Sequence, residues 1–418
     1  MRPLDVAIIG GGTAGCATAI LLSRAGHAVT VYERVAEPGP VGAGITLQPT
    51  GLHVLEELGV YDAVVGRGAR IDRLRCETPS GRAVVDLAYA DVSSALFGVG
   101  IHRGALFQAL FAEARRAPGV TFRLGVAAED LRRGLGTRRG RQWIVDDEGN
   151  AHGPHDLVVV CDGARSHLRD DTHVRKSIER YPWGALWFVG EDAEIGEKSL
   201  LWQVVRGNQL MMGLLPTGLG PDPGNRAPLV SLFWSIREDA VPAWRARGLA
   251  AWKEDVLAVA PRAAGLVEQI EDESQVLFAA YHDVVMDPWN TSNVVYIGDA
   301  AHAMSPQLGQ GANLALWDAW VLAGCLADEE HLPLALDRYT RARRDHLGFY
   351  QFATRTLTPF FQGDEAWFGV LRDLFMPIAG AVPPTRWAMT AAMTGTLDGF
   401  FGRRLAVRDP RRVGPLVE

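Results

Sequence analysis

The first part of the chain places apolar residues in two short runs and, between them, at helical spacing. Residues 6–9 form an apolar run of the kind that a buried parallel strand shows. The segment TAGCATAILLSRAG follows with helical spacing and ends at Gly26, which suits a helix C-terminus. HAVTVYER then predicts a second strand, which closes at Glu33. The pattern therefore predicts a strand–turn–helix–strand unit of an α/β fold.

Strand and helix patterns continue to alternate after this unit. The glycines and prolines of residues 35–51 exclude a helix until the apolar LHVLEELGV. Residues 70–97 indicate strands and turns, and residues 101–117 have the spacing of an amphipathic helix. VTFRLG and the apolar LVVVC before Asp162 predict two more strands.

From about residue 175 to residue 287 the pattern is β-rich. In SLLWQVVRGNQLMMGLLP, Gly207 and Asn208 predict the two-residue turn of a hairpin. Both faces of this hairpin are apolar, so we expect both to be covered. One of the faces either packs in the core or forms a wall of the substrate site. A turn of this length gives the pairs Val204 with Met211, Gln203 with Met212 and Trp202 with Gly213.

The last third begins with the apolar strand pattern NVVYIGDAAH, which puts Asp299 at a strand tip. A loop follows, and a helix is predicted to begin near Gly309. Residues 335–418 are predicted to be mostly helical.

Composition excludes several classes of function. The 418 residues are 48% hydrophobic and 22% charged, as in globular proteins with more than one domain. A net charge of −7 argues against nucleic acid as a partner, because phosphate binding needs clustered cations. No apolar stretch suits a signal peptide or a membrane span, so we expect no integral membrane association. Four cysteines without paired spacing predict no disulfide framework and no metal site, and suit a reducing cytoplasm: Cys16, Cys76, Cys161 and Cys325.

Three glycines stand where the first strand ends. Gly10, Gly12 and Gly15 give the pattern G-x-G-x-x-G in the context of a dinucleotide site. The first allows a tight turn, the second a close pyrophosphate, and the third close packing of helix on strand. Glu33 stands where an acid accepts hydrogen bonds from a ribose diol, and its charge would repel a 2′-phosphate. The pattern predicts FAD or NAD rather than NADP, with Arg34 either beside the adenine or in solvent.

GGGTAG, CDGARSHLR and GDAAHAMSPQLGQGANLALWDA together resemble the class A flavoprotein monooxygenases, the group of para-hydroxybenzoate hydroxylase, salicylate hydroxylase and the ubiquinone-biosynthesis hydroxylases. GAGITLQPTGLHVLEELGV and IHRGALFQAL extend the resemblance to nearly the whole chain. Thr50, where many relatives carry Asn, and Trp317 depart from the family. The resemblance implies an α/β fold in which a β-rich domain interrupts a Rossmann-type FAD-binding domain. The expected parts are the FAD-binding domain at residues 1–75, 98–174 and 288–334, the β-rich substrate domain at 76–97 and 175–287, and a helical C-terminal region at 335–418.

The resemblance also implies cofactor contacts. Asp299 would hold the ribityl and pyrophosphate region, Arg103 the phosphates or ribityl chain, and the Ala128 backbone the adenine. The start of the helix near Gly309 would direct free N–H groups at flavin N1 and the C2 carbonyl and stabilise the anionic reduced flavin. Pro306 would lie beside the isoalloxazine ring. The full expected set for non-covalent FAD is Gly10, Gly12, Ala14, Gly15, Glu33, Arg34, Arg103, Ala128, Asp162, Gly163, Asp299, Pro306, Gly309, Gly311, Ala312 and Asn313.

The reductant is expected to bind transiently, because the sequence has no second dinucleotide fingerprint. Asp162 and Gly163 match a motif that serves both FAD and the passing NAD(P)H. Arg165 and Arg169 either bind the phosphates of NAD(P)H or form surface salt bridges. His302 matches the family too, and we expect it to be a structural histidine.

Substrate contacts are harder to place from sequence, and no arginine stands out as a clamp for a carboxylate. Tyr281 or His282 either deprotonates a phenol or serves in the core or surface, and the second role is favoured for each. The candidates for the substrate pocket are Gln48, Trp202, Gln203, Met211, Met212, Phe233, Tyr281 and Pro306.

The resemblance implies hydroxylation or epoxidation of an aromatic or apolar polycyclic molecule with NAD(P)H and O2, through a flavin C4a-hydroperoxide. A flavin oxidase or dehydrogenase is the first alternative. A halogenase is disfavoured because FWSIRED is not the W-x-W-x-I-P motif and none of the three lysines, Lys176, Lys198 and Lys253, stands where a halogenase has its lysine. A non-catalytic protein of the FAD fold is disfavoured by the intact GQGAN segment. The sequence leaves open the substrate and its regiochemistry, NADH or NADPH, and the oligomeric state.

Overall fold

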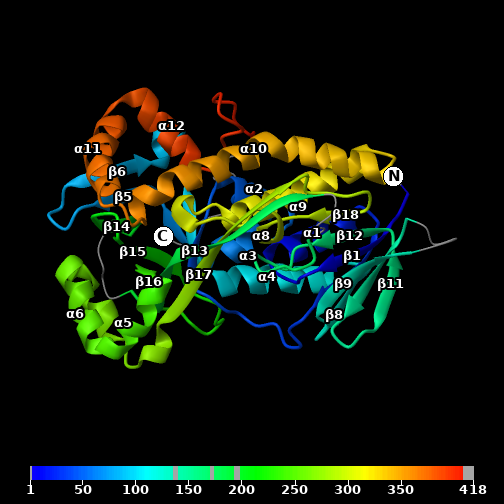
Figure 1. Cartoon of the computed structure of the whole chain (residues 1–418), viewed down its shortest axis with the longest axis horizontal. Coiled ribbons are helices and arrows are strands. Elements are labelled where there is room, and N and C mark those ends of the chain that lie inside the picture. Colours follow the sequence, from blue (N-terminus) through cyan, green and yellow to red (C-terminus); the bar gives the residue numbers. More distant parts are fainter. Residues whose placement is uncertain (1, 135–139, 170–173, 193–197, 408–418) are drawn as a thin grey trace.

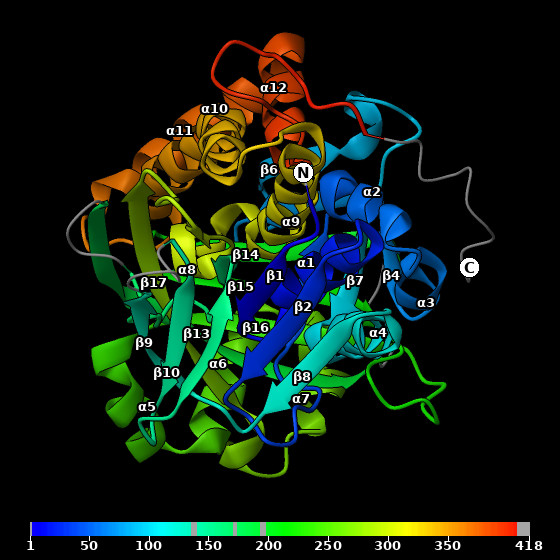
Figure 2. The same ribbon diagram turned by 90° about the vertical axis from the view of Figure 1, so that its right-hand side faces the viewer.

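A computed structural model describes residues 2–134, 140–169, 174–192 and 198–407. Its centre is a five-stranded parallel sheet of order β18-β12-β1-β2-β8, seen with its helices in Figures 1 and 2. The central strands β1, β12 and β18 are apolar and mostly buried because both faces of the sheet are covered, whereas the edge strand β8 is partly exposed. They are β1 (Asp5–Ile9), β2 (Ala28–Glu33), β8 (Val120–Leu124), β12 (Leu157–Val160) and β18 (Val294–Tyr296).

Helices cover one face of this sheet and a small antiparallel sheet lies on the other side. Helix α1 (Thr13–Arg24) packs between α4 (Arg103–Arg116) and α9 (Gly311–Asp328). The antiparallel sheet has the order β11-β10-β9. Its strands are β9 (Ala128–Arg133), β10 (Gln142–Asp146) and β11 (Ala151–His155).

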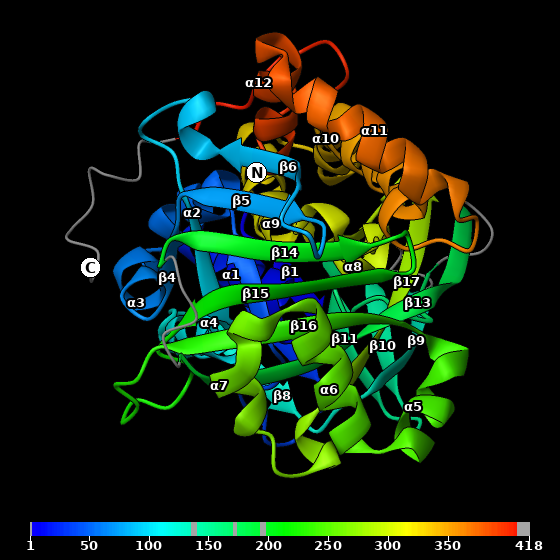
Figure 3. The ribbon, with the colours of Figure 1, turned by 90° about the vertical axis from the view of Figure 1, so that its left-hand side faces the viewer.

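A seven-stranded sheet forms the second large layer, with the order β17-β13-β16-β15-β14-β5-β6 (Figure 3). Helices α5 (Val241–Arg247), α6 (Leu249–Val259) and α7 (Ala264–Glu268) pack on one of its faces. The strands are β5 (Arg73–Glu77), β6 (Ala83–Ala88), β13 (Arg175–Glu191), β14 (Leu200–Arg206), β15 (Leu210–Gly218), β16 (Leu229–Arg237) and β17 (Leu277–Asp287).

A three-stranded sheet of order β3-β7-β4 connects the two large sheets, because all its strands contact β15. Its strands are β3 (Gly44–Leu47), β4 (Ala69–Ile71) and β7 (Gly98–His102). Strand β3 lies inside residues 35–51, which we predicted to be a loop. Helix α2 (Pro49–Glu57) also begins earlier than predicted, since proline is well suited to the first turn of a helix. Helix α3 (Tyr61–Val65) follows.

The predicted register of the β14–β15 hairpin is wrong by one residue. Arg206 pairs with Leu210, so three residues rather than two form the turn. Gly207 still takes a left-handed conformation, with φ +59°. The shift gives the observed pairs Trp202 with Leu214, Gln203 with Gly213, Val204 with Met212 and Val205 with Met211.

Three helices follow α9 in the sequence: α10 (Leu332–Phe361), α11 (Trp367–Ala381) and α12 (Pro383–Met393). Helix α10 runs along the top of both large layers in Figure 1. Residues 394–407 are not helical, and the part of the predicted helical region at 408–418 lies outside the described residues. Within the described ranges, no helix is long and apolar enough to cross a membrane.

Short helices complete the element order. Helix α8 (Asp299–His302) follows β18 directly and leads to η6 (Pro306–Leu308). The other 3₁₀ helices among the described residues are η1 (Tyr89–Asp91), η3 (Glu238–Ala240), η4 (Pro261–Ala263) and η5 (Glu273–Gln275). The predicted domain boundary between residues 75 and 76 falls inside β5, and the domain boundaries remain predictions.

Candidate active site

The three fingerprint glycines have different surroundings at the end of β1. Gly10 has φ +102°, and a Cβ there would lie 2.6 Å from the Cys161 carbonyl oxygen. A Cβ on Gly15 would overlap the Gly10 carbonyl oxygen. A Cβ on Gly12, by contrast, would meet no atom within 4 Å. The protein itself therefore requires Gly10 and Gly15, whereas the space beside Gly12 is open to a ligand at the N-terminus of α1.

Glu33 is held in place at the tip of β2. Its Oε2 accepts a hydrogen bond of 2.7 Å from the Gly11 N–H, and its Oε1 accepts one of 2.9 Å from the Val35 N–H. The carboxylate is half-buried, beside the glycine turn, where a ribose diol would meet it. Arg34 is exposed.

The second edge of the candidate cofactor site follows β12. Oδ1 of Asp162 is buried without a hydrogen-bond partner. Burial raises the pKa of this carboxyl, and Ser166 partly offsets the effect. Gly163 has φ +94°, and a Cβ there would meet no atom within 4 Å. An unpartnered acceptor beside open space fits a ligand that brings a hydrogen-bond donor.

The third edge is the segment from α8 to the start of α9. Asp299 is exposed at the N-terminus of α8. The predicted helix start near Gly309 needs a small correction: Gly309 has φ +62°, Gln310 is the N-cap and α9 begins at Gly311. A Cβ on Gly309 would meet nothing, and one on Gly311 would approach only Asp299 Oδ1, at 3.9 Å. This helix start is therefore open to a ligand.

Asn313 supports the helix start from behind. Its Oδ1 accepts a hydrogen bond from the Gln48 N–H at 2.7 Å, and its Nδ2 donates to the carbonyls of Thr46 at 3.0 Å and Gly309 at 3.1 Å. A Cβ on Gly51 would overlap Asn313 Oδ1, so Gly51 lets α2 approach α9 closely. The side chain thus fixes β3 and α2 against α9. Its hydrogen bonds do not use the N-terminal backbone N–H groups of α9.

A buried ionic cluster fixes α8 against α9 and α10. Asp318 accepts hydrogen bonds from the Gly298 N–H at 2.8 Å and Arg343 Nε at 2.7 Å, and its Oδ2 lies 2.5 Å from His302 Nε2. Arg343 also lies 2.5 Å from His346 Nδ1. Burial alone would raise the pKa of Asp318, but His302 and Arg343 outweigh it and hold that pKa well below its ordinary value.

This cluster confirms the structural role expected of His302. Burial, and then Arg343, lower the pKa of His346 to about 3. Its Nε2 lies 2.9 Å from the Gly395 carbonyl oxygen, so a neutral His346 donates this hydrogen bond. Sequence reasoning missed Arg343 and His346, because no local motif marks a contact between separate helices.

The position of Arg169 contradicts both roles that the sequence suggested for it, binding the phosphates of NAD(P)H and forming a surface salt bridge. Arg169 is buried, and its guanidinium donates to the carbonyls of Ala300 at 2.8 Å, Ala164 at 3.0 Å and Ser166. It is therefore neither a free phosphate ligand nor a surface salt bridge, and it ties the segment after β12 to α8. Arg165 is exposed, and its role stays a prediction.

Two further residues that we predicted to contact the cofactor lie at the starts of α4 and β9. Arg103 is exposed at the first position of α4, and its backbone N–H donates to the Ala43 carbonyl at 2.9 Å. Ala128 is buried at the start of β9 and pairs with Asp146. The cofactor roles of Arg103, Ala128 and Ala14 stay predictions.

One face of the seven-stranded sheet turns towards the connecting sheet β3-β7-β4, because Ser231 on this face accepts a hydrogen bond of 3.0 Å from the Gly44 N–H of β3. Gln203, Gly213 and Phe233 lie side by side on it in neighbouring strands. Trp187 pairs with Phe233, with the ring centroids 5.3 Å apart. We call Gln203, Gly213, Phe233, Trp187 and Tyr281 the central row.

The polar groups of the central row are neutral. Trp187 Nε1 donates to the Tyr281 hydroxyl at 3.3 Å, and burial raises the pKa of Tyr281 to about 12. Tyr281 therefore remains a phenol near pH 7, which argues against a role as base. Gln203 is 9% exposed, and among the described residues no hydrogen bond is recorded for its amide.

Two of the predicted pocket residues lie on the opposite face of this sheet. Trp202 and Met212 are buried in the core formed with α6 and its neighbours. Trp202 Nε1 donates to Glu77 Oε1 at 3.0 Å, and Arg262 lies 4.5 Å from the ring centroid. We therefore leave both residues out of the substrate wall proposed below. The predicted hairpin register had paired Gln203 with Met212, and so had put residues of opposite faces side by side.

The remaining pocket candidates lie on other elements or pack outside the central row. Met211 packs in a cluster with Phe361 of α10. Gln48 Oε1 accepts a hydrogen bond of 2.6 Å from the Tyr89 hydroxyl. Pro306 begins η6, which contacts α10. The preceding Ala303 carbonyl accepts a hydrogen bond of 2.8 Å from the Val284 N–H of β17. This contact brings the Pro306 turn near the strand that carries Tyr281.

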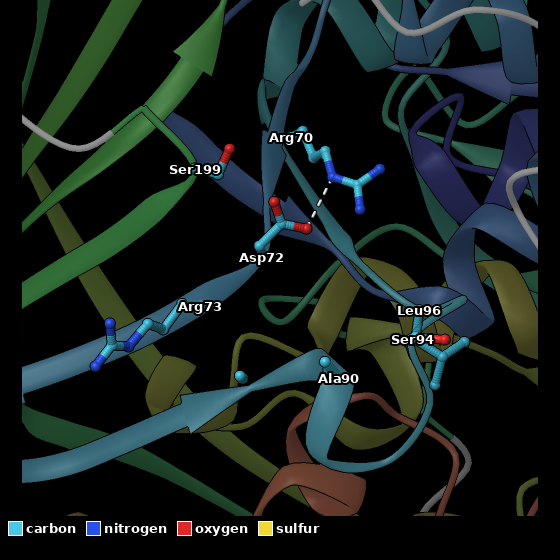
Figure 4. Close-up of a pocket in the computed structure, with 8 residues that line it drawn as sticks. Arg70, Asp72, Arg73, Ala90, Ser94, Leu96 and Ser199 are labelled. Carbon is cyan, nitrogen blue, oxygen red and sulfur yellow. Dashed lines mark hydrogen bonds and ion pairs between the residues drawn. The ribbon is translucent and has the colours of Figure 1, made fainter.

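A separate open cleft of about 350 Å³ lies by β4, β5 and β6 (Figure 4). Arg70 and Asp72 in its wall bond to each other at 2.8 Å. None of the predicted site residues lines it; its wall is Arg70, Asp72, Arg73, Ala88, Ala90, Ser94, Leu96 and Ser199.

Comparison with known proteins agrees with this geometry. Residues 3–348 match the family model described as an FAD binding domain. The chain is 29% identical over 384 residues to aurachin C monooxygenase/isomerase of Stigmatella aurantiaca, covering 89% of this chain and 94% of the relative. The chain belongs to the class A FAD-dependent monooxygenases. It is also 27% identical over 334 residues to 3-hydroxybenzoate 6-hydroxylase of Klebsiella oxytoca, covering 77% and 79%.

Among solved structures, the fold is similar to that of PqsL of P. aeruginosa in complex with 2-aminobenzoylacetate. The TM-score is 0.73 at 22% identity, covering 88% of this chain and all of that one. At this identity the likeness concerns the fold alone. As a class A monooxygenase the chain is an FAD-dependent enzyme, and membership of this family disfavours the oxidase, halogenase and non-catalytic alternatives.

Proposed function

We propose that this monooxygenase hydroxylates or epoxidises an uncharged aromatic or apolar polycyclic molecule held between the Pro306 turn and the central row. NAD(P)H and O2 are its proposed co-substrates. The observation that carries the proposal is the uncharged character of the central row. Its face of the sheet has no Asp, Glu, Lys or Arg at the strand positions two residues to either side of Gln203, Phe233 and Trp187. The acid that follows Tyr281 on β17, Asp283, already pairs with Arg355 at 2.6 Å. A carboxylate there would lose its water without gaining a cation.

The chain would bind the dinucleotide by its own backbone and carboxylates. The open space at Gly12 and the N–H groups of α1 fit the pyrophosphate, and Glu33 fits the ribose diol. The N-terminus of α9 would face the flavin with free N–H groups that favour negative charge. When bound, FAD takes up electrons from NAD(P)H and activates O2.

The central row would position the substrate and exclude water. Phe233 and Trp187 offer aromatic faces against which a flat molecule can stack. The Gln203 amide and the Tyr281 hydroxyl offer neutral hydrogen bonds to a carbonyl or phenol group. A proton released from such a phenol would not be taken by Tyr281, whose pKa of about 12 keeps it protonated. We also propose a cytoplasmic location, since the four cysteines are free and the reductant is NAD(P)H.

The test is a panel of hydroxylated naphthalenes and quinolines, each supplied with its carboxylated counterpart. We expect the neutral member of each pair to stimulate NAD(P)H oxidation and to give a product one oxygen atom heavier. Under labelled dioxygen, mass spectrometry should find the label in that product. A preference for the carboxylated members would contradict the uncharged substrate, and oxidation with hydrogen peroxide as the sole oxygen product would contradict monooxygenation.

A further inference from the structure

Helix α11 has one side firmly fixed to the protein. Gly369 lies against the turn of the β14–β15 hairpin, where a Cβ would come within 3.0 Å of the Gly207 carbonyl carbon. Arg372 is buried and donates to the carbonyls of Gly207 at 2.8 Å and Phe360 at 3.0 Å. It also pairs with Asp373 at 2.7 Å. Figures 1 and 3 show this helix at the outer edge of the molecule, beyond β5 and β6.

The other side of α11 is apolar and exposed. Large side chains recur there at spacings of three and four residues, as in the seam between two packed helices. Each of them is between 45% and 68% exposed, which is unusual for a contiguous apolar surface on a monomer. We call this surface the α11 face; it consists of Trp367, Val370, Leu374, Phe375, Ile378 and Val382.

Charge indicates what covers the α11 face. In residues 366–385 the charged side chains are Arg372 and Asp373, and these pair with each other. Beyond the two ends, Asp364 pairs with Arg237 and Arg386 pairs with Asp91. The face thus has no cations for anionic lipid headgroups, and the chain carries a net charge of −7. An uncharged apolar surface of the same shape would cover the α11 face better than an anionic membrane would.

We propose that the α11 face is the interface of a symmetric dimer in which α11 packs antiparallel to its copy. A two-fold axis makes such a surface complementary to itself. Leu374 is the midpoint of Trp367–Ala381, so the axis would pass beside it and the two copies of Leu374 would meet. The six side chains offer on the order of 600 Å² on each copy, close to the roughly 800 Å² of a standard interface.

The first test is Leu374→Glu, measured by size-exclusion chromatography with light scattering on the FAD-loaded protein. We expect the wild type to have twice the 45.4 kDa mass of the chain and Leu374→Glu to have that mass once. Leu334→Glu is the matched control, since Leu334 is 50% exposed at the start of α10, away from the face. The control should remain a dimer, and FAD content should be equal in all three proteins. A monomeric wild type at tens of micromolar would overturn the proposal.

The second test places the axis. The four native cysteines are buried, so under mild oxidation we expect only an introduced surface thiol to react. Leu374→Cys should give a covalent dimer, because only a residue at the axis meets its own copy, and Leu334→Cys should not. A wild-type dimer without a Leu374→Cys cross-link would put the interface elsewhere. Flotation of a monomeric wild type with phosphatidylcholine–phosphatidylglycerol vesicles would show that lipid covers the face instead.

Discussion

At the scale of single residues, the fingerprint glycines divide into those that the fold requires and one that a ligand requires. Gly10 and Gly15 approach the protein's own backbone. Gly12 does not, and its φ of −77° is open to any residue. The sequence pattern alone gives all three glycines the same weight, whereas the structure separates them.

We therefore expect Gly12→Ala to weaken FAD binding at least about 10-fold while the free energy of unfolding of the apoprotein changes by less than about 0.5 kcal/mol. The added methyl group would occupy the open space beside the helix N-terminus. Fluorescence titration with FAD and denaturant unfolding of the apoprotein measure the two effects.

Gly15→Ala is the control for this prediction, since its methyl group would overlap the Gly10 carbonyl and destabilise the apoprotein itself. If Gly12→Ala binds FAD as the wild type does, the pyrophosphate lies elsewhere.

Glu33 has two tasks, which substitution by glutamine separates. Its carboxylate holds the Gly11 and Val35 N–H groups, and we propose that it also accepts the ribose hydroxyls. Glu33→Gln keeps a neutral acceptor but loses the charge, so FAD affinity should fall roughly 10- to 100-fold, in line with about 1.5–3 kcal/mol for a charge-assisted hydrogen bond. The apoprotein should lose only about 1 kcal/mol of stability, because the glutamine NH2 cannot accept one of the two backbone N–H groups that the carboxylate holds. Unchanged affinity in the FAD titration would remove Glu33 from the ribose site.

At the scale of elements, the cluster behind α8 makes stability depend on pH. His346 binds a proton at its ordinary pKa when unfolded but only near pH 3 when folded. Between pH 6.5 and about 3 the unfolded state thus binds more protons, and stability falls as the pH falls. For this one group the loss from pH 7 to pH 5 is about 2 kcal/mol.

We expect His346→Gln to reduce the loss of stability between pH 7 and pH 5. Glutamine can still accept a hydrogen bond from Arg343 and donate one to the Gly395 carbonyl, but it does not titrate. Other histidines contribute to both proteins equally, so the difference between two urea-unfolding series at pH 5 and pH 7 isolates His346. Parallel pH profiles would mean that His346 is protonated in the folded protein.

The sequence predicted the elements that have a local signature. The β1–α1–β2 unit is confirmed because an apolar run, a glycine turn and a helical spacing occur together in residues 6–33. The hairpin register was wrong because both faces of β14 and β15 are apolar, so no alternation marked the faces. One extra residue in the turn then moved every pair.

Contacts between distant elements were also beyond sequence reasoning. Asp318 and Arg343 lie on different helices, and nothing near either residue marks the other as its partner. Arg169 is the last residue of CDGARSHLR, and the sequence suggested either a phosphate ligand or a surface salt bridge. Its guanidinium instead donates to backbone carbonyls that only the folded chain brings together.

At the scale of the whole molecule, the proposed chemistry needs two layers that the chain builds from interleaved segments. Strand β5 precedes β7 in sequence, yet β5 belongs to the seven-stranded sheet and β7 to the connecting sheet. The Ser231–Gly44 and Val284–Ala303 hydrogen bonds hold the layers together at separate points. The central row lies on the same face of the sheet as Ser231, and water exclusion there would decide whether oxygen reaches the substrate.

Neighbouring residues on β16 test this arrangement, because their side chains point to opposite faces of one strand. Phe233 is half-buried in the central row, whereas Leu232 is fully buried in the core with α6. Phe233→Ala should admit water beside the substrate, so the yield of oxygenated product per NAD(P)H falls severalfold and hydrogen peroxide rises. Leu232→Ala should cost about 2–5 kcal/mol of stability, through its cavity, and leave that yield near the wild-type value. Product and peroxide are measured together, with a neutral substrate found in the panel above. Equal yields in Phe233→Ala and the wild type would place the substrate away from the central row, even if hydroxylation itself were confirmed.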